Sequence, residues 1–364
     1  MIQNQSHKLK VGILGTRGIP NQYGGFERWA EQLSEGLVRR DCQVTVYNSH
    51  FHPYQSRTYK GVDIIKKWDP KGLGLVSQFI YDLLCVLNAR KQKFDVVIQL
   101  GYTTSSMWAW LLPKNVKIIY NMDGMEWQRE KYKGLLKTYL KKAEKWAVKY
   151  SDVIIADSEP IKHYLDDKYN LHSEFVAYPA QVFNNPDESI LDKFNLKRED
   201  YYLLIARFQP DNNLERIIKG VLESNTSKQL IVVGDYRNRY GRYLRKKYND
   251  KRVVFLGKLY NKVELDNLRY YCAIYFHGHS AGGTNPSLLE AMSTSCVVCA
   301  HDNQFNHSVL ENNAYYFKDE MQIVAVLNDF NGKESKNGWI KNNLDKLHQH
   351  YNLEDIIDKY YKLF

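Results

Sequence analysis

Apolar residues recur along the chain in short continuous runs separated by amphipathic stretches. In the first half the runs lie at 10–14, 43–47, 62–65, 95–100, 116–120 and 153–156. Runs of this length indicate strands that are buried on both faces of a sheet. Several intervening stretches have helical spacing, and the first carries apolar residues at Phe26, Trp29, Ala30, Leu33 and Leu37. Strands that alternate with helices predict a parallel sheet covered on both faces.

The same pattern restarts after a turn-rich break at Asn184–Asp187. Further runs follow at 201–206, 229–233, 252–256, 273–276 and 296–300. The fold class predicted is therefore α/β, with two Rossmann-like domains that face each other across a cleft. We place the first domain at 1–185 and the second at 186–352, and we expect a last helix at 353–364 to pack back on the first domain.

Composition is that of a globular protein with room for two domains. The chain has 364 residues, no apolar run long enough to cross a membrane, and a start without the apolar core of a secretory signal. Its five cysteines are scattered, which favours reduced thiols in a cytoplasmic protein. Cys296 and Cys299 form a C-x-x-C inside an apolar run, and we interpret them as buried strand residues.

Positive charge is concentrated in the first half of the chain. Of the formal net charge of +10, residues 1–180 carry 26 Lys and Arg against 18 Asp and Glu, and residues 181–364 carry 25 against 23. The first half therefore suits an anionic partner, such as a membrane surface, a pyrophosphate or a nucleic acid.

Eight basic residues lie in the stretch Arg129–Tyr150. Its apolar and aromatic residues form one helical stripe: Tyr132, Leu135, Leu136, Tyr139, Leu140, Ala143, Trp146, Ala147 and Tyr150. A basic amphipathic helix of this kind lies on anionic lipid, or it packs on a sheet with its lysines in solvent. The sequence leaves both interpretations open.

Three motifs that could bind a ligand lie at predicted strand ends. The loop Gly15–Gly25 leads into a helix, where glycine backbone and free N–H groups can approach an anion, although it has no G-x-G-x-x-G. Arg207 follows a strand and can hold a diphosphate in the crevice where α/β proteins bind ligands. The segment His277–Met292 follows another strand and opens a helix. Each motif also has a plainer interpretation: the glycine loop is a tight connection, Arg207 is a surface arginine, and the third segment is a well-capped helix.

Within His277–Met292, Asn285 suits the N-cap and Pro286 the first helical position. Thr284 and the amides after it could then bind phosphate oxygens, and Glu290, one turn further, could accept hydrogen bonds from a ribose. The loop Asn121–Trp127 carries two carboxylates that could orient an acceptor hydroxyl, or that are simply solvated turn residues.

Histidine spacing gives no zinc motif, and no G-x-S-x-G elbow is present. We therefore expect no metal and no cofactor.

At these motifs the chain resembles the retaining GT-B glycosyltransferases of family 4. More closely, it resembles a bacterial rhamnosyltransferase-like branch whose members begin G-T-R-G-I-P-x-x-Y-G-G-F-E, which is Gly15–Glu27 here. The likeness continues through 121–127, 156–158, 206–213, 233–235 and 282–292, and so covers nearly the whole chain.

The motifs and the resemblance together predict the roles of individual residues. The predicted catalytic residues are Asp123 and Arg207. The donor-binding residues are Gly24, Gly25, Arg207, Asp235, Gly283, Thr284, Asn285 and Glu290. The acceptor-binding residues are Tyr23, Glu126 and Trp127. The first domain would then hold the acceptor, and the second the nucleotide-sugar.

Two positions depart from the family pattern. The first glutamate of the Glu-x7-Glu motif falls on Gly282, and the lysine five residues after the phosphate arginine falls on Asn212. These departures leave recognition of the donor sugar unassigned.

The resemblance implies metal-independent transfer of a sugar, with rhamnose from a dTDP donor as the first choice, to a lipid-linked oligosaccharide in surface polysaccharide synthesis. The enzyme would be cytoplasmic and peripheral at the inner face of the membrane. Alternatives are glucosyl, galactosyl or mannosyl transfer from UDP or GDP sugars, a nucleotide-sugar epimerase of the same fold, and a nucleic-acid-binding protein.

Overall fold

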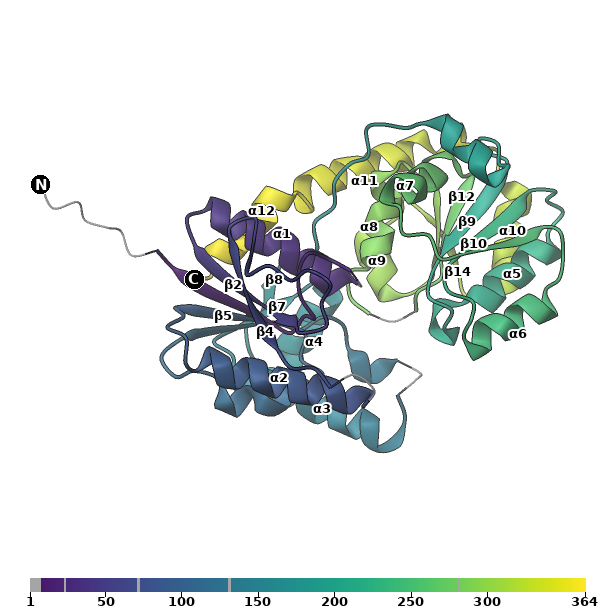
Figure 1. Cartoon of the computed structure of the whole chain (residues 1–364). Helices are drawn as coiled ribbons and strands as arrows, with labels where there is room; N and C mark the ends of the chain where they lie inside the picture. Colours follow the sequence, from purple (N-terminus) through teal and green to yellow (C-terminus); the bar gives the residue numbers. More distant parts are fainter. Residues whose placement is uncertain (1–7, 23, 71–72, 130–131, 281) are drawn as a thin grey trace, which may run out of the picture. The chain divides into compact units, whose positions relative to one another are not determined.

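The predicted apolar runs form the strands of two sheets in a computed structural model of the protein (Figure 1). The structure describes residues 8–22, 24–70, 73–129, 132–280 and 282–364. The chain divides into one unit of Met1–Tyr178 with Glu354–Phe364 and a second of Pro179–Leu353. The division lies a few residues before the 185/186 boundary expected from the sequence. The segment just before the turn-rich break belongs to the second unit because the amides of Ala180 and Phe183 donate to the carbonyls of Tyr351 and Ser293.

The first unit is built on a sheet with the strand order β3-β4-β2-β1-β5-β6-β7-β8 among the described residues. The strands are β1 (Lys10–Leu14), β2 (Gln43–Ser49), β3 (Thr58–Tyr59), β4 (Val62–Lys67), β5 (Val96–Leu100), β6 (Lys117–Asn121), β7 (Val153–Ala156) and β8 (Glu174–Phe175). All neighbours pair in parallel except β3 with β4. The edge strands β3 and β8 were not predicted, and the other strand ends lie within two residues of the predicted runs.

Helices cover both faces of this sheet. They are α1 (Gly25–Arg39), α2 (Leu75–Ala89), α3 (Gly134–Lys149), α4 (Glu159–Tyr169) and α12 (Leu353–Tyr361), with 3-10 turns η1 (Ser105–Leu111) and η2 (Glu126–Gln128). The helix α3 is shorter than the predicted 129–150 stretch, and Leu135, a member of its apolar stripe, is 91% exposed. Gly134 opens α3 with a positive φ of 55°, so the helix begins too late for Tyr132 to join that stripe.

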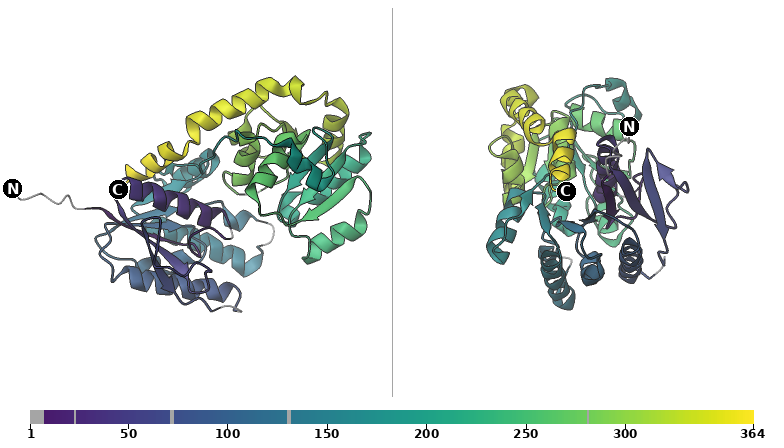
Figure 2. Two further views of the ribbon diagram at one scale, coloured as in Figure 1. Left: turned by 45° about the horizontal axis from the view of Figure 1, so that its top comes forward. Right: turned by 90° about the vertical axis from the view of Figure 1, so that its left-hand side faces the viewer.

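The C-terminal helix α12 lies beside α1 in the first unit (Figures 1 and 2). Gly36 makes this close approach possible, because a Cβ there would lie 2.2 Å from the Ile357 side chain. The buried Tyr360 hydroxyl accepts from the Trp29 indole N–H at 3.3 Å and from the Asn121 amide at 2.7 Å. Tyr360 thus connects α12 to both α1 and β6.

The second unit is built on a parallel sheet with the strand order β11-β10-β9-β12-β13-β14 among the described residues. Its strands are β9 (Tyr201–Ile205), β10 (Gln229–Val233), β11 (Val253–Gly257), β12 (Ile274–His277), β13 (Val298–His301) and β14 (Tyr315–Phe317). The predicted runs form all of these except β14, which is short and lies at the edge.

The sheet of the second unit lies between two groups of helices (Figure 1). One face carries α5 (Leu214–Glu223), α6 (Arg239–Lys247) and α10 (Glu320–Asp329). The other carries α7 (Lys262–Tyr271), α8 (Pro286–Ser293), α9 (Gln304–Leu310) and α11 (Asn337–His350). The remaining turns are η3 (Glu188–Phe194), η4 (Pro210–Asn212) and η5 (Lys333–Lys336). The core under α5 and α10 includes Leu204, Ile217, Ile218, Val232 and Ile323, all buried.

Candidate active site

The first glycines of the N-terminal motif are required by the turn that follows β1. Gly15 and Gly18 have φ values of +92° and +123°, which favour glycine. A Cβ would lie 2.2 Å from the Leu100 carbonyl oxygen at the first position and 2.3 Å from the Asn48 side chain at the second. Asn48 also accepts from the Ile19 amide and donates to its carbonyl. These glycines therefore fix the loop against the neighbouring strands.

The second glycine pair starts α1, with Gly24 as an extended N-cap and Gly25 as the first helical residue. The Glu27 carboxylate occupies the first turn of this helix and accepts from the Arg17 amide at 3.2 Å. A Cβ on Gly24 would lie 3.1 Å from that carboxylate. Phosphate binding by the two glycines stays a prediction, and a phosphate there would meet the negative charge of Glu27. Tyr23 lies outside the described residues.

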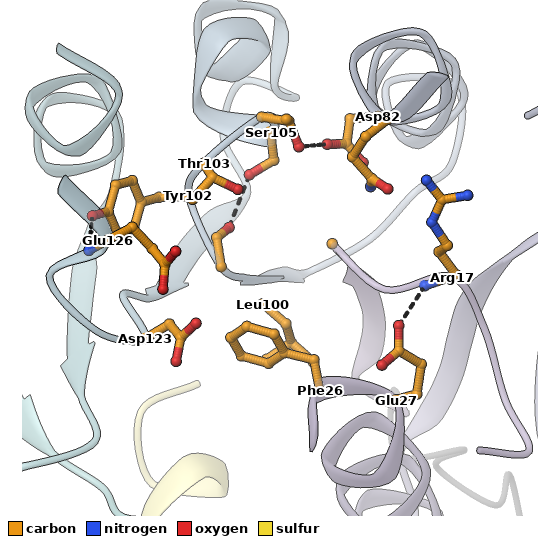
Figure 3. A pocket seen from close by; sticks show the side chains of 14 residues that line it. Arg17, Phe26, Glu27, Asp82, Leu100, Tyr102, Thr103, Ser105, Asp123 and Glu126 are labelled. Carbon is orange, nitrogen blue, oxygen red and sulfur yellow. Dashed lines mark hydrogen bonds between the residues drawn. The ribbon is translucent and has the colours of Figure 1, made fainter. Parts of the chain in front are cut away.

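A pocket of about 240 Å³ lies at the carboxyl ends of β1 and β5 in the first unit (Figure 3). Its walls come from the loop after β1, the start of α1, the helix α2, and the loops after β5 and β6. The acidic residues in this lining are Glu27, Asp82, Asp123 and Glu126. The pocket therefore collects carboxylates from four separate segments.

Asp82 of α2 is the most deeply buried of these acids. Its carboxylate accepts from the Thr104 hydroxyl at 2.5 Å and from the Gln78 amide at 2.9 Å. Burial raises the pKa of Asp82 to about 7, although these hydrogen bonds and the Arg17 charge oppose the rise. Near neutral pH the carboxyl can thus accept or donate a hydrogen bond. Sequence reasoning missed Asp82, because it occurs inside an apolar helical stretch without a motif around it.

The residues of the predicted acceptor loop after β6 do not all lie at the same site. Asp123 and Glu126 both line the pocket, with Asp123 in a left-handed conformation at φ +50°. Glu126 is buried and pairs with Arg129 at 2.6 Å. Trp127, in contrast, donates its indole N–H to the buried Glu144 of α3 at 2.9 Å. The structure therefore brings Asp123 and Glu126 together, and it places Trp127 against α3 instead.

Arg207 is the exposed cation at the carboxyl end of β9 in the second unit. Within the part of the chain that the structure describes, its guanidinium makes no hydrogen bond or ion pair, so it is available to an anion. Asn212 is buried and donates its amide to the Arg207 carbonyl at 2.7 Å. The position where the family has a lysine thus holds a side chain that braces the turn after β9 and carries no charge.

The loop after β12 is tied to the turn after β9. The Gly278 carbonyl accepts from Asn213 at 2.8 Å, and the Ser280 amide and hydroxyl donate to the Asp211 carbonyl at 3.0 and 2.8 Å. A Cβ on Gly278 would lie only 2.1 Å from the Asn212 carbonyl oxygen. Close backbone contact between these loops therefore determines where Arg207 lies.

Histidines at the end of β12 are packed as aromatic rings. His277 is buried and stacks on His279 with 4.5 Å between ring centroids. Burial, with the nearby His279 and Arg269, lowers the pKa of His277 well below its usual value, so the ring is neutral. The described residues contain no cluster of three or more histidine, cysteine or acidic ligands that could hold a metal.

Asn285 caps α8 as the sequence predicts, since its side chain accepts from the Ser287 amide at 3.0 Å and Pro286 is the first helical residue. Gly283 and Thr284 immediately precede this cap, half-buried and buried respectively.

Two predicted donor-binding acids are engaged in ion pairs. Glu290 is 25% exposed and accepts from the buried Arg269 at 2.5 Å, while Arg269 also contacts Asp266 at 3.1 Å. Ribose binding by Glu290 therefore has to coexist with an ion pair that the sequence did not reveal. Asp235 pairs with Arg237 at 2.9 Å and with Lys258 at 3.0 Å, and the hydrogen bonds from Arg237 hold its pKa well below the usual range.

Comparisons with known families divide the chain in a similar way. Residues 8–181 match the family described as Domain of unknown function (DUF1972). Residues 187–344 match the family described as Glycosyl transferases group 1. A search of curated proteins gave no match to the chain.

Solved structures share the whole arrangement of elements at low identity. A sucrose-phosphate synthase from Thermosynechococcus elongatus is 15% identical with a TM-score of 0.80, and the alignment covers 98% of each chain. HepE of Anabaena, in complex with UDP and glucose, is 13% identical with a TM-score of 0.77, covering 98% of this chain and 99% of the other. A glycosyltransferase from Rickettsia africae is 12% identical with a TM-score of 0.67, covering 98% of each chain. The protein thus has the GT-B fold and is a glycosyltransferase that carries a Glycosyl transferases group 1 domain at residues 187–344.

Proposed function

We propose that the protein transfers a sugar from a nucleotide diphosphate-sugar to a lipid-linked oligosaccharide in surface polysaccharide synthesis. The observation that carries the proposal is the Glycosyl transferases group 1 domain, in which the exposed Arg207 lies at a strand end. HepE, which has the same fold, is solved in complex with UDP-glucose, and this supports a nucleotide-sugar donor. The G-T-R-G-I-P motif favours rhamnose from dTDP-rhamnose, with UDP-glucose, UDP-galactose and GDP-mannose as alternative donors.

The proposed mechanism uses fixed charges and no metal. Arg207 would bind the leaving diphosphate, and the helix start after Gly283 would offer it backbone N–H groups. Asn212 supplies no charge, so Arg207 carries more of this stabilisation than it would beside a lysine. In the first unit, Asp123 would accept a hydrogen bond from the acceptor hydroxyl.

Nucleotide release from a panel of donors tests this function. The panel contains dTDP-rhamnose, UDP-glucose, UDP-galactose and GDP-mannose, each with and without a polyprenyl-pyrophosphate saccharide. We expect release from one donor to increase strongly when the acceptor is added. Arg207→Ala should abolish this release, whereas Arg242→Ala, which removes another exposed arginine of the second unit, should not. Conversion of one nucleotide-sugar into another without acceptor would show an epimerase and would contradict the proposal.

We further propose that the first unit contacts an anionic membrane surface, because the lipid part of the acceptor cannot leave the bilayer. The structure contains no helix, within the described ranges, that is long and apolar enough to cross a membrane. The outward face of α3 carries an exposed stripe of one apolar residue, one threonine and three lysines: Leu135, Thr138, Lys142, Lys145 and Lys149. The adjoining η1 exposes Trp110, at 61%, and Met107. Lysines beside exposed apolar side chains are typical of a surface that binds anionic lipid.

Charge reversal on this stripe tests the membrane contact. Lys142, Lys145 and Lys149 are changed together to Glu, leaving Lys137 and Lys141, which lie over the Trp127 ring, intact. We expect the wild type to sediment with vesicles containing phosphatidylglycerol at low salt and to dissociate at high salt, and the variant to stay in solution. The control variant carries the same charge change in the second unit, at the exposed Lys246, Lys251 and Lys341. Equal sedimentation of both variants would refute the α3 contact.

A further inference from the structure

The pocket of the first unit has a charge opposite to that of the segment which contains it. Residues 1–180 carry a net charge of +8 in the sequence. Of the described residues that line the pocket, four are acidic (Glu27, Asp82, Asp123 and Glu126) and Arg17 is the single basic one. The excess of carboxylates is therefore local to the pocket (Figure 3).

The cations near the pocket are already paired with carboxylates. Arg17 contacts the buried Asp69 at 2.5 Å, and the Ser77 hydroxyl also donates to Asp69. Arg129 contacts Glu126 at 2.6 Å. Among the described residues that line the pocket, a phosphate or carboxylate would therefore meet carboxylates and no cation without an acidic partner. This arrangement excludes an anionic ligand far more strongly than a neutral one.

The remaining surfaces of the pocket are those that bind sugar hydroxyls and ring carbons. Asp82 accepts from Thr104 and Gln78 and has further oxygen lone pairs for a ligand hydroxyl. The rings of Phe26 and Tyr102 also line the pocket and offer apolar faces. Carboxylates beside aromatic rings suit a hydroxyl-rich pyranose, which has polar edges and an apolar face.

We propose that this pocket holds the sugar ring of the acceptor that receives the transferred residue, and that this ring is uncharged. A hexose or deoxyhexose fits this description, whereas a uronic acid or a phosphorylated sugar does not. The pyrophosphate of the lipid carrier must then lie outside the pocket. This inference rests on the proposed function and names the class of acceptor that the function uses.

Binding of simple glycosides tests the inference separately from catalysis. The probes are octyl glycosides of glucose, galactose, rhamnose, glucosamine and glucuronic acid, with affinities measured by NMR titration at pH 8, above the pKa of Asp82. The variants are Asp123→Asn, at a half-buried position, and Asp82→Asn, at a buried one. Asp167→Asn removes an exposed carboxylate of the same unit that lies outside the pocket, and serves as the matched control.

We expect at least one neutral glycoside to bind and the glucuronide to bind at least about tenfold more weakly. Asp123→Asn and Asp82→Asn should weaken binding of the neutral glycoside and strengthen binding of the glucuronide, since both changes remove negative charge. Asp167→Asn should change neither affinity. If these acids had only a structural role, both substitutions would weaken binding of the neutral glycoside and of the glucuronide together. That result would overturn the proposal.

Three other outcomes would also overturn it: no glycoside binding, a glucuronide that binds as well as the glucoside, or a glucosamine preference of tenfold or more, which would indicate a cationic sugar. Donor hydrolysis without acceptor is measured on the same samples. If hydrolysis is normal and glycoside binding fails, the pocket assignment is wrong and the proposed function stands. If hydrolysis is absent with every donor, the proposed function itself is wrong.

Discussion

Replacing Asp82 with asparagine should change how the stability of the first unit depends on pH. The ordinary pKa of an aspartate is 3.8, and burial raises that of Asp82 to about 7 in the folded protein. Between these values the folded state keeps a proton that the unfolded chain has lost, so stability falls as pH rises. About three pH units at about 1.4 kcal/mol each give a loss of about 4 kcal/mol between pH 4 and pH 8.

Asparagine has no proton to lose at this position, and the Thr104 hydroxyl can rotate to accept from its amide. The free energy of unfolding of the variant should therefore rise by about 4 kcal/mol relative to that of the wild type between pH 4 and pH 8. Urea unfolding at pH 4, 5, 6, 7 and 8 measures the difference, with Asp167→Asn as the control that should show no trend. Tryptophan fluorescence is a suitable signal because six of the seven tryptophans belong to the first unit. If the difference in unfolding free energy between variant and wild type varied by less than about 1 kcal/mol over these pH values, Asp82 would be ionised throughout and the reasoning would be refuted.

Three predictions concern the second unit. Arg207→Ala should weaken donor affinity in calorimetry and leave the melting temperature unchanged, because the guanidinium is exposed; unchanged affinity would remove it from the site. Glu290→Gln should lower the free energy of unfolding by about 2 kcal/mol, since the buried Arg269 loses a charged partner; an unchanged urea midpoint would mean that the ion pair contributes nothing. Gly278→Ala should shift the turn after β9 and reduce donor affinity, because its Cβ would meet the Asn212 carbonyl; wild-type affinity would show that the turn tolerates the shift.

Most of the fold follows from local sequence patterns. Buried parallel strands need continuous apolar runs, so β1, β7 and β10 have the predicted bounds. The edge strands β3, β8 and β14 have two or three residues each and are too short to produce such a run. The start of α3 was misjudged because the apolar spacing reaches back to Tyr132, whereas the helix begins only at Gly134.

The candidate site was less predictable because it depends on contacts between distant segments. Asp82 is a pocket residue only because Thr104 and Gln78 surround it and the loop after β1 covers it. No local pattern marks an aspartate in the middle of an apolar helix. Glu290 fits a known motif, but its pairing with Arg269 depends on how α7 packs on α8. Capping at Asn285 was predictable, since it needs only the residues next to it.

The return of α12 to the first unit has a consequence for synthesis on the ribosome. The first unit consists of two separate stretches of chain, and the second unit lies between them in sequence. Residues 179–353 are therefore all synthesised before Ile357 and Tyr360 are added, so the second unit is complete in sequence while the first is not. Until those side chains arrive, Trp29 and the surface around Gly36 have no cover from α12. The N-terminal unit is thus begun first and completed last.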